Sequence, residues 1–228
     1  MGGIVLYLII VGPAFLLAMY AQYKVKSTFS HYSQIPNSRG LTGAEVAQAI
    51  LDGNNIHDVR IEPTEGFLSD HYDPSEKVLR LSPDVYEGQS QSAVGVAAHE
   101  VGHAIQHATN YSWLGMRSAL VPLVQLGSFL WMPLFFIGLL IASMKLALVG
   151  LAVFGVVALF QLVTLPVEFD ASRRALVEVE RLGIMRGSEL DGARAVLNAA
   201  ALTYVAAAIQ TIATILYYLI ILNSGNRE

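Results

Sequence analysis

The chain has 228 residues, of which 54% are hydrophobic and only 14% are charged, whereas soluble domains carry roughly a quarter charged residues. A chain this apolar needs lipid around it, and its formal net charge of −4 gives no reason to expect a nucleic-acid partner. It contains no cysteine, which excludes disulfide bonds and thiolate metal sites.

Four stretches are long and apolar enough to cross about 30 Å of hydrocarbon. The first lacks a basic region at its start and has no small-residue cleavage site before Lys24, so we expect a retained anchor and not a signal peptide. Only Ser143, Met144 and Lys145 separate the second stretch from the third, which predicts an antiparallel hairpin. The predicted segments are an anchor at residues 1–23, a transmembrane hairpin at residues 118–167, a fourth span at residues 197–222 and a polar tail at residues 223–228.

Residues 24–117 are of a different character and predict a small extramembrane module. Thr42 and Glu45 have the spacing of a capping box and open an amphipathic helix. Short alternating runs follow, with turn residues between the last two, which indicates a short antiparallel sheet. A stretch rich in alanine and free of proline then predicts a helix at about residues 90–107.

This predicted helix carries the sequence His99-Glu100-Val101-Gly102-His103. Residues four apart lie on one face of a helix, so both imidazoles can bind one ion at about 2.0–2.1 Å. Glu100 is adjacent but displaced around the helix, which leaves its carboxylate free to take a proton from an attacking water. The alternative is that the three side chains are satisfied inside a core helix, which costs several kcal/mol unless they are paired or bind a metal.

A catalytic zinc site usually has three protein ligands and a water. The metzincin solution is excluded, because it needs glycine at position 106 and histidine at 109, where this chain has Gln106 and Thr109. The other solution is a carboxylate from a second helix, and residues 168–196 form the polar helical segment that follows the hairpin. Glu168 and Asp170 are the candidates; they lie about 200° apart on a helix, so only one faces the metal, and we favour the longer Glu168. The predicted site is thus gluzincin-like, with one zinc ion per chain, and residues 24–117 are predicted to form a zincin-like catalytic module.

Several further residues have more than one interpretation. His107 lies one turn beyond His103 and either stabilises the oxyanion, lines the substrate cleft or is an interface histidine. Tyr72, Tyr111 and Tyr204 are alternative oxyanion donors. The strand Val78, Leu79, Arg80 and Leu81 either binds an extended peptide by strand addition or is an ordinary paired strand. We expect His31 and His57 to be solvated in polar loops.

The runs HYDPSEKVLRLSPDVY, AVGVAAHEVGHAIQH and PVEFDASRRAL resemble the YugP-type neutral zinc metallopeptidases of bacteria. More distantly the chain is similar to HtpX-type membrane proteases, which share the order anchor, H-E-x-x-H helix, membrane hairpin and E-x-x-x-D motif. The resemblance implies that His99, His103 and Glu168 are zinc ligands and that Glu100 is the general base. The position of the HtpX-type aspartate is Ser172 here, so a different residue, such as Asp170, would have to orient a ligand histidine.

The segments together predict an α+β membrane protein, mainly α, with about four transmembrane helices and a small module containing a short antiparallel sheet and the H-E-x-x-H helix. Twelve of the fourteen Lys and Arg residues lie in 24–117 or 173–194. The positive-inside bias therefore predicts a multi-pass protein of the bacterial plasma membrane whose catalytic module faces the cytoplasm.

The predicted function is zinc-dependent hydrolysis of peptides or membrane proteins at the surface of the lipid bilayer, in membrane protein quality control. A non-catalytic, zinc-stabilised membrane scaffold is the alternative, although it gives Glu100 no purpose. A site-two-type protease is disfavoured because Leu51-Asp52-Gly53 precedes the H-E-x-x-H motif instead of following it. A metal transporter is disfavoured because the four predicted spans contain no Asp, Glu or His.

Overall fold

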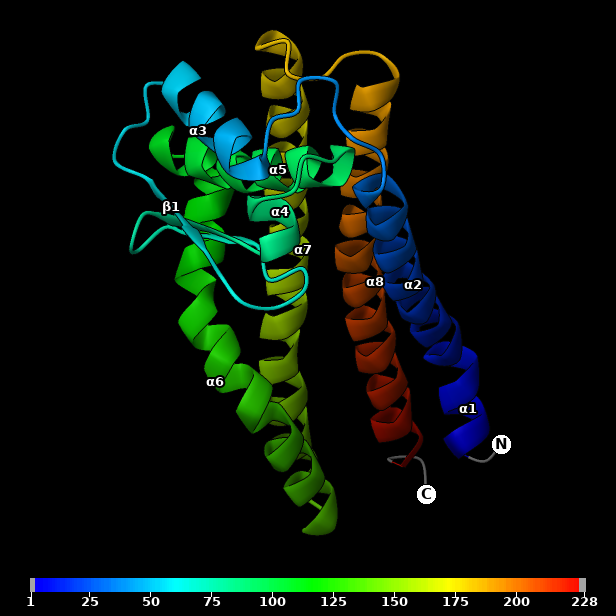
Figure 1. Cartoon of the computed structure of the whole chain (residues 1–228). Coiled ribbons are helices and arrows are strands. Elements are labelled where there is room, and N and C mark those ends of the chain that lie inside the picture. The colour runs from blue at the N-terminus through cyan, green and yellow to red at the C-terminus, as the bar shows by residue number, and fades with distance from the viewer. Residues whose placement is uncertain (1–2, 226–228) are drawn as a thin grey trace. The chain divides into compact units, whose positions relative to one another are not determined.

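The computed structural model describes residues 3–225, most of which lie in helices (Figure 1). The helices are α1 (Gly3–Ile10), α2 (Gly12–Ser33), α3 (Gly43–Gly53), α4 (Pro83–Tyr86), α5 (Gln91–Ala108), α6 (Ser112–Leu140), α7 (Met144–Arg181) and α8 (Ser188–Gly225). The strands are β1 (Arg60–Pro63), β2 (His71–Asp73) and β3 (Val78–Leu81). The prediction of a mainly helical chain with a small sheet is confirmed.

The chain forms two compact units. The first contains the residues up to 22, residues 115–165 and the residues from 203 onward. The second contains Tyr23–Leu114 and Pro166–Leu202. The helices α2, α7 and α8 each contribute one part to the first unit and another part to the second.

Within residues 3–225, three helices are long and apolar enough to cross a membrane, namely α6, α7 and α8. Helices α1 and α2 pass the same test only as a pair, which is bent by 43° at the break between them. Three of the four predicted spans thus have single helices of sufficient length, and a fourth span requires the bent pair to act as one.

The hairpin of α6 and α7 packs closely in the first unit. A Cβ atom on Gly150 would lie 2.5 Å from the backbone nitrogen of Phe135, so only glycine fits at this contact. Trp131 stacks on Phe154 with ring centroids 4.2 Å apart, beside the fully buried Phe135. Because lipid supplies no hydrophobic force between helices, such close contact of small residues and rings holds the hairpin together.

Helix α3 lies in the second unit, and its first turn is capped as predicted. The backbone nitrogen of Glu45 donates to the Thr42 hydroxyl, and the Glu45 carboxylate accepts from the backbone nitrogen of Thr42. The buried face of α3 packs on α5 in the main hydrophobic core. Most of α5 is itself buried, and its many alanines allow neighbouring elements to approach it closely.

The sheet is mixed, so the prediction of an antiparallel sheet was wrong for one of its two pairs. The central strand β3 pairs antiparallel with β2 and parallel with β1. The predicted turn at Asp73, Pro74 and Ser75 does lead from β2 towards β3. Residues 64–70, however, carry the chain from β1 to the far side of β3. Burial explains this order, because the fully buried Leu79 and Leu81 put β3 at the centre.

This pairing also corrects the predicted role of Val78, Leu79, Arg80 and Leu81 as a substrate-binding strand. Strand addition needs an edge strand whose backbone groups are unpaired. Both sides of β3 are already taken by β1 and β2. The outer edges of the ladder in the described residues belong to β1 and β2.

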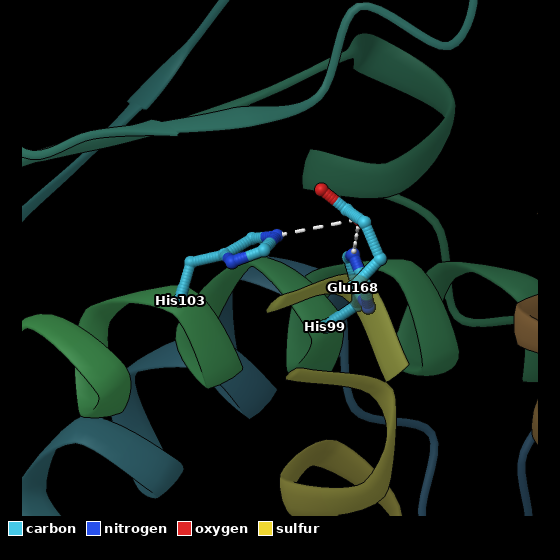
Figure 2. A group of neighbouring side chains, drawn as sticks. All are labelled: His99, His103 and Glu168. Atoms are coloured by element: carbon cyan, nitrogen blue, oxygen red, sulfur yellow. Dashed lines mark hydrogen bonds and ion pairs between the residues drawn. The ribbon is translucent and has the colours of Figure 1, made fainter. Parts of the chain in front are cut away.

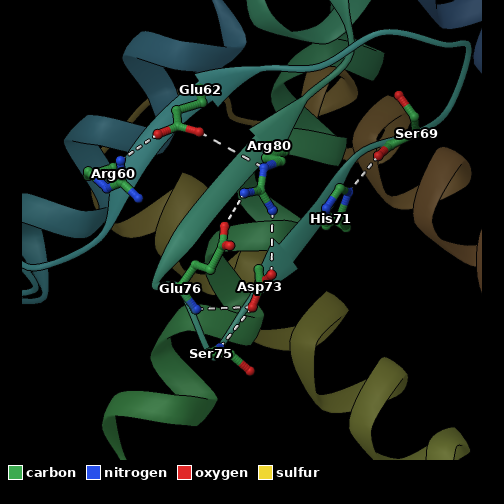
Figure 3. A network of polar contacts seen from close by, with 8 residues as sticks. All are labelled: Arg60, Glu62, Ser69, His71, Asp73, Ser75, Glu76 and Arg80. Carbon is green, nitrogen blue, oxygen red and sulfur yellow. Dashed lines mark hydrogen bonds and ion pairs between the residues drawn. The ribbon is translucent and has the colours of Figure 1, made fainter.

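The two faces of β3 differ in polarity. Arg80 points away from the core and forms ion pairs with Glu76 and Asp73 and a longer one, 3.9 Å, with Glu62 (Figure 3). Leu79 and Leu81 lie on the core side of the strand and are fully buried. Apolar burial, not this partly exposed network of charges, therefore dominates the stability of the sheet.

The substitution Leu79→Ala is expected to destabilise the protein by about 2–5 kcal/mol, because it leaves a cavity in the core. Arg80→Ala is expected to cost much less than Leu79→Ala, because its ion pairs are partly solvated. Denaturant unfolding of both variants in detergent measures the two losses. Losses of equal size would contradict this division between the two faces.

The polar segment at residues 168–196 divides between two helices. Its first part continues α7 to Arg181, and its last part begins α8 at Ser188. The turn between them contains Gly183 and Gly187, both with positive φ. His31, expected in a loop, lies instead in the last turns of α2, because the helix continues beyond the apolar anchor.

Candidate metal centre

Three of the predicted site residues meet in the second unit. His99 and His103 extend from α5 towards the carboxylate of Glu168 on α7 (Figure 2). The Nε2 atoms of His99 and His103 lie 3.3 and 3.7 Å from Oε2 of Glu168. One donor atom from each of the three side chains lies within 4.8 Å of the others. Such an arrangement can hold a single metal ion.

The group is largely buried and contains the carboxylate of Glu168. Glu168 is 2% exposed and His103 is 8% exposed. Burial by itself lowers the pKa of His103, but the hydrogen bond with Glu168 and the negative charges of Glu100 and Glu168 outweigh it, so the pKa of His103 lies above its ordinary value. The surroundings of this imidazole therefore favour a positive charge, which a proton or a metal ion can supply.

Gly102, inside the motif, brings the two helices together. A Cβ atom at this position would lie 2.5 Å from the backbone oxygen of Ala171 on α7. No side chain fits there without moving one helix away from the other. The glycine between the two histidines thus sets the distance at which Glu168, three residues before Ala171, reaches both imidazoles.

Gln106 fixes the orientation of His103. This glutamine is fully buried, and its Nε2 donates to the backbone oxygen of Val167 and to Oδ2 of Asp170. Because both donors of the amide are used, its Oε1 faces Nδ1 of His103 at 3.0 Å as an acceptor. His103 then carries its proton on Nδ1, which leaves the lone pair of Nε2 directed at the metal position.

Ser172 holds His99 in a similar way. Its Oγ lies 3.1 Å from Nδ1 of His99, one turn along α7 from Glu168. We expected Ser172 not to orient a ligand histidine, because the HtpX-type pattern has an aspartate at this position. A neutral hydroxyl takes the place of that carboxylate, and it can accept a hydrogen bond from Nδ1–H of His99 while Nε2 faces Glu168.

Asp170 lies outside the ligand group and supports it indirectly. Its carboxylate accepts from Gln106 and forms ion pairs with Arg173 and Arg174. Asp170 contacts His103 only through Gln106. The sequence had suggested Asp170 as the residue that orients a ligand histidine in place of the HtpX-type aspartate. The two carboxylates on this turn of α7 thus occupy different environments.

Glu100 is 8% exposed and lies between the two histidines in the sequence. Within residues 3–225 its carboxylate forms no hydrogen bond with another side chain. Burial raises the pKa of Asp70, and the charge of Glu100 contributes further to this increase. Glu100 is therefore a buried carboxylate near Asp70, and the lone pairs of its oxygens are not used by the described side chains.

His107 lies farther along α5 and contacts a different set of residues. Its Nδ1 is 2.8 Å from the hydroxyl of Tyr72, and both line a cavity of about 370 Å³ with the ion pair of Lys77 and Asp58. Burial, with the charges of Asp58 and Asp73, raises the pKa of Tyr72 to about 12, so the phenol stays neutral. The oxyanion role of His107 or Tyr72 stays a prediction.

The two other tyrosines considered from the sequence lie elsewhere. Tyr111 is beside Arg174, whose guanidinium carbon is 5.6 Å from the centre of the ring. Tyr204 belongs to α8 and to the first unit. Neither is among the residues that form the ligand group.

The donor set fits zinc. Two imidazole nitrogens and one carboxylate oxygen are the ligands of a catalytic zinc site that keeps a fourth position for water. Gln106 and Ser172 each contact the Nδ1 atom of a ligand histidine, as supporting groups in zinc sites do. With no cysteine in the chain, a thiolate site is excluded.

Comparison with known proteins agrees with this geometry. The family model described as "Putative neutral zinc metallopeptidase" matches residues 7–223. The chain belongs to this family. It is also 47% identical over 212 residues to a Bacillus subtilis (strain 168) protein named "Putative membrane protease YugP", covering 93% of this chain and 94% of that one. No solved structure matches the chain.

Gln106 is the site residue that sequence reasoning missed. It was considered only as the residue that excludes the metzincin pattern. Its spacing was a usable signal, because a glutamine three residues after a ligand histidine lies on the same side of the helix. Nothing in the sequence indicated that its partners would be Val167 and Asp170, which are more than sixty residues away.

Replacing each carboxylate of α7 separately tests the ligand set. Glu168→Gln is expected to reduce zinc affinity far more than Asp170→Asn, because it removes a ligand. Asp170→Asn should lower the affinity by about 10–100-fold, as is typical for a residue that supports a ligand. Competition with a chelator measures both dissociation constants. The reverse order would exclude Glu168 as the third ligand.

Proposed function

We propose that the protein is a zinc-dependent metallopeptidase that hydrolyses peptide bonds of membrane proteins or membrane-delivered polypeptides. The observation that carries this proposal is the buried carboxylate of Glu100, which forms no side-chain hydrogen bond within residues 3–225 and is next in sequence to His99 of a His-His-Glu group that can hold a metal ion. Membership of a family of zinc metallopeptidases supports it. The proposed cofactor is one zinc ion per chain, held by His99, His103 and Glu168.

Zinc in this site would polarise the scissile carbonyl and lower the pKa of the attacking water. Glu100 accepts the proton of that water as it attacks, and the protonated carboxyl then donates it to the leaving amine. His99 and His103 stay in place because Ser172 and Gln106 hold their Nδ1 atoms. The chain's own contribution is therefore to orient the ligands and to move one proton.

The substrate class follows from where the ligands lie in the sequence. Glu168 comes three residues after Leu165, the last residue of an apolar stretch of α7. The metal helix α5 ends at Ala108, and the apolar helix α6 begins at Ser112. Both ligand-bearing segments thus adjoin membrane-type helices, which favours substrates at the bilayer surface.

We also propose that the second unit faces the cytoplasm of a bacterial cell, because most Lys and Arg residues lie in it.

An extended substrate would pair with β2 and not with β3. Strand β2 is at the edge of the sheet, beside β3, and it contacts α5. Its residue Tyr72 is the one bonded to His107 on α5. Strand addition at β2 would therefore present a peptide beside the helix that carries Glu100, His99 and His103.

Glu100→Gln keeps the shape of the side chain but removes the proton acceptor. Zinc content is expected to equal that of the wild type, and hydrolysis of casein or of an unfolded membrane protein should fall by about 10²–10⁴-fold. Glu65→Gln, an exposed glutamate on the 64–70 loop, is the matched control and should keep full activity.

The same experiment separates the enzyme from a zinc-stabilised scaffold. A scaffold predicts that neither protein cleaves the substrate and that both bind zinc equally. Cleavage by the Glu100→Gln variant at the wild-type rate would exclude Glu100 as the general base.

A further inference from the structure

A second cavity lies wholly within the second unit, away from the residues of the metal centre. Its volume is about 510 Å³, within the range of roughly 300–1,000 Å³ that is usual for small-molecule sites. It is lined by residues of α2 and α8, which are Lys24, Ser27, Thr28, His31, Tyr32, Ala195, Asn198, Ala199 and Leu202.

The two helices contribute different kinds of side chain. On α2 the residues Lys24, Ser27, Thr28 and His31 follow the spacing that puts them on one helical face. All four are polar and carry donors for hydrogen bonds. This wall of the cavity is suited to a ligand rich in acceptor oxygens.

On α8 the lining residues 195, 198, 199 and 202 follow the same spacing. Three of them, Ala195, Ala199 and Leu202, are apolar, and the fourth, Asn198, adds an amide. The ligand therefore needs a polar part for α2 and an apolar part for α8.

The charge of the cavity is positive and uncompensated. No acidic residue precedes Glu45 in the sequence, and none occurs in α8 after Asp191. No ion pair joins Lys24 to a carboxylate among residues 3–225, and within the same range Thr28 and Asn198 form no side-chain hydrogen bond. Several donors and one full positive charge thus face a cavity that contains no protein anion.

The place of these residues in the chain indicates where the ligand comes from. Lys24 directly follows the apolar stretch that ends at Tyr23, and Leu202 directly precedes the part of α8 that belongs to the first unit. In both helices, therefore, the residues that line the cavity adjoin the apolar, membrane-type stretch. Phosphate groups of lipids occur at this level of a membrane.

We propose that this cavity binds the headgroup of an anionic phospholipid. The lipid phosphate lies against Lys24 and accepts hydrogen bonds from Thr28 and Asn198, while Ala199 and Leu202 contact the glycerol and the start of an acyl chain. A soluble phosphate would satisfy the polar wall alone, and the apolar wall of α8 favours the lipid. The site does not depend on the peptidase activity.

Lipid binding by the full-length protein in nanodiscs or detergent, followed by native mass spectrometry, tests the proposal. The probes are phosphatidylglycerol, phosphatidylcholine and inorganic phosphate. Wild-type protein should bind phosphatidylglycerol more tightly than phosphatidylcholine. Lys24→Gln should weaken binding of phosphatidylglycerol about fivefold, which corresponds to about 1 kcal/mol for one lysine beside an anionic lipid.

Lys26→Gln is the matched control, because it removes the same charge from the same helix at a residue that does not line the cavity. It should bind phosphatidylglycerol as the wild type does. Asn198→Leu keeps every charge but fills the cavity from the exposed side of α8. It should weaken binding as much as Lys24→Gln does, with an unchanged unfolding temperature in zwitterionic detergent.

Equal losses in the Lys24 and Lys26 variants would overturn the proposal in favour of diffuse attraction to a charged surface. Unchanged binding in both the Lys24→Gln and Asn198→Leu variants would also overturn it. If millimolar inorganic phosphate displaced phosphatidylglycerol completely, the site would be one for soluble phosphate and not for lipid.

Discussion

A buried carboxylate between two imidazoles is the constraint on which the rest of the second unit depends. Glu168 is almost completely removed from solvent, and burying an ionised carboxylate costs many kcal/mol unless a cation compensates it. Protonated imidazoles provide that compensation in part, and a divalent cation provides more of it. The fold thus places a negative charge where it is stable only with a positive partner, which is the condition for a tightly held metal ion.

The helices meet at this carboxylate through contacts that tolerate little change. Gly102 allows α5 to touch the backbone of α7 at Ala171, and the fully buried Gln106 joins His103 to Val167 and Asp170. Loss of Gln106 would leave polar groups unsatisfied in the core, and a side chain at position 102 would push the two helices apart. The same few residues therefore set both the stability of this unit and the geometry of the His-His-Glu group, and the candidate metal centre is part of its core.

The sequence was informative where chemistry depends on local spacing. The H-E-x-x-H motif, the capping box of α3 and three membrane-type helices were all readable from residues close together in the chain. Glu168 was predicted to join His99 and His103 because a zinc site usually needs a third ligand and few carboxylates adjoin a span. The structure brings these three residues together, although no local pattern specified the contact between α5 and α7.

The errors and omissions concern contacts between distant segments. Strand order depends on which strand the core buries, so the parallel pairing of β1 with β3 could not be derived from turn residues. The substitution of Ser172 for an aspartate suggested a missing support, whereas the hydroxyl itself reaches His99. The role of Gln106 was missed for the same reason, because its partners Val167 and Asp170 lie on another helix. In each case the deciding information was the packing of elements far apart in sequence.

The most direct test of the central claim is the X-ray absorption spectrum of the zinc-loaded wild-type protein at the zinc edge. The account predicts about four nitrogen and oxygen donors at about 2.0–2.1 Å, two of which show the multiple scattering of imidazole. A spectrum with three or more imidazoles, or with none, would contradict a site formed by His99, His103 and Glu168.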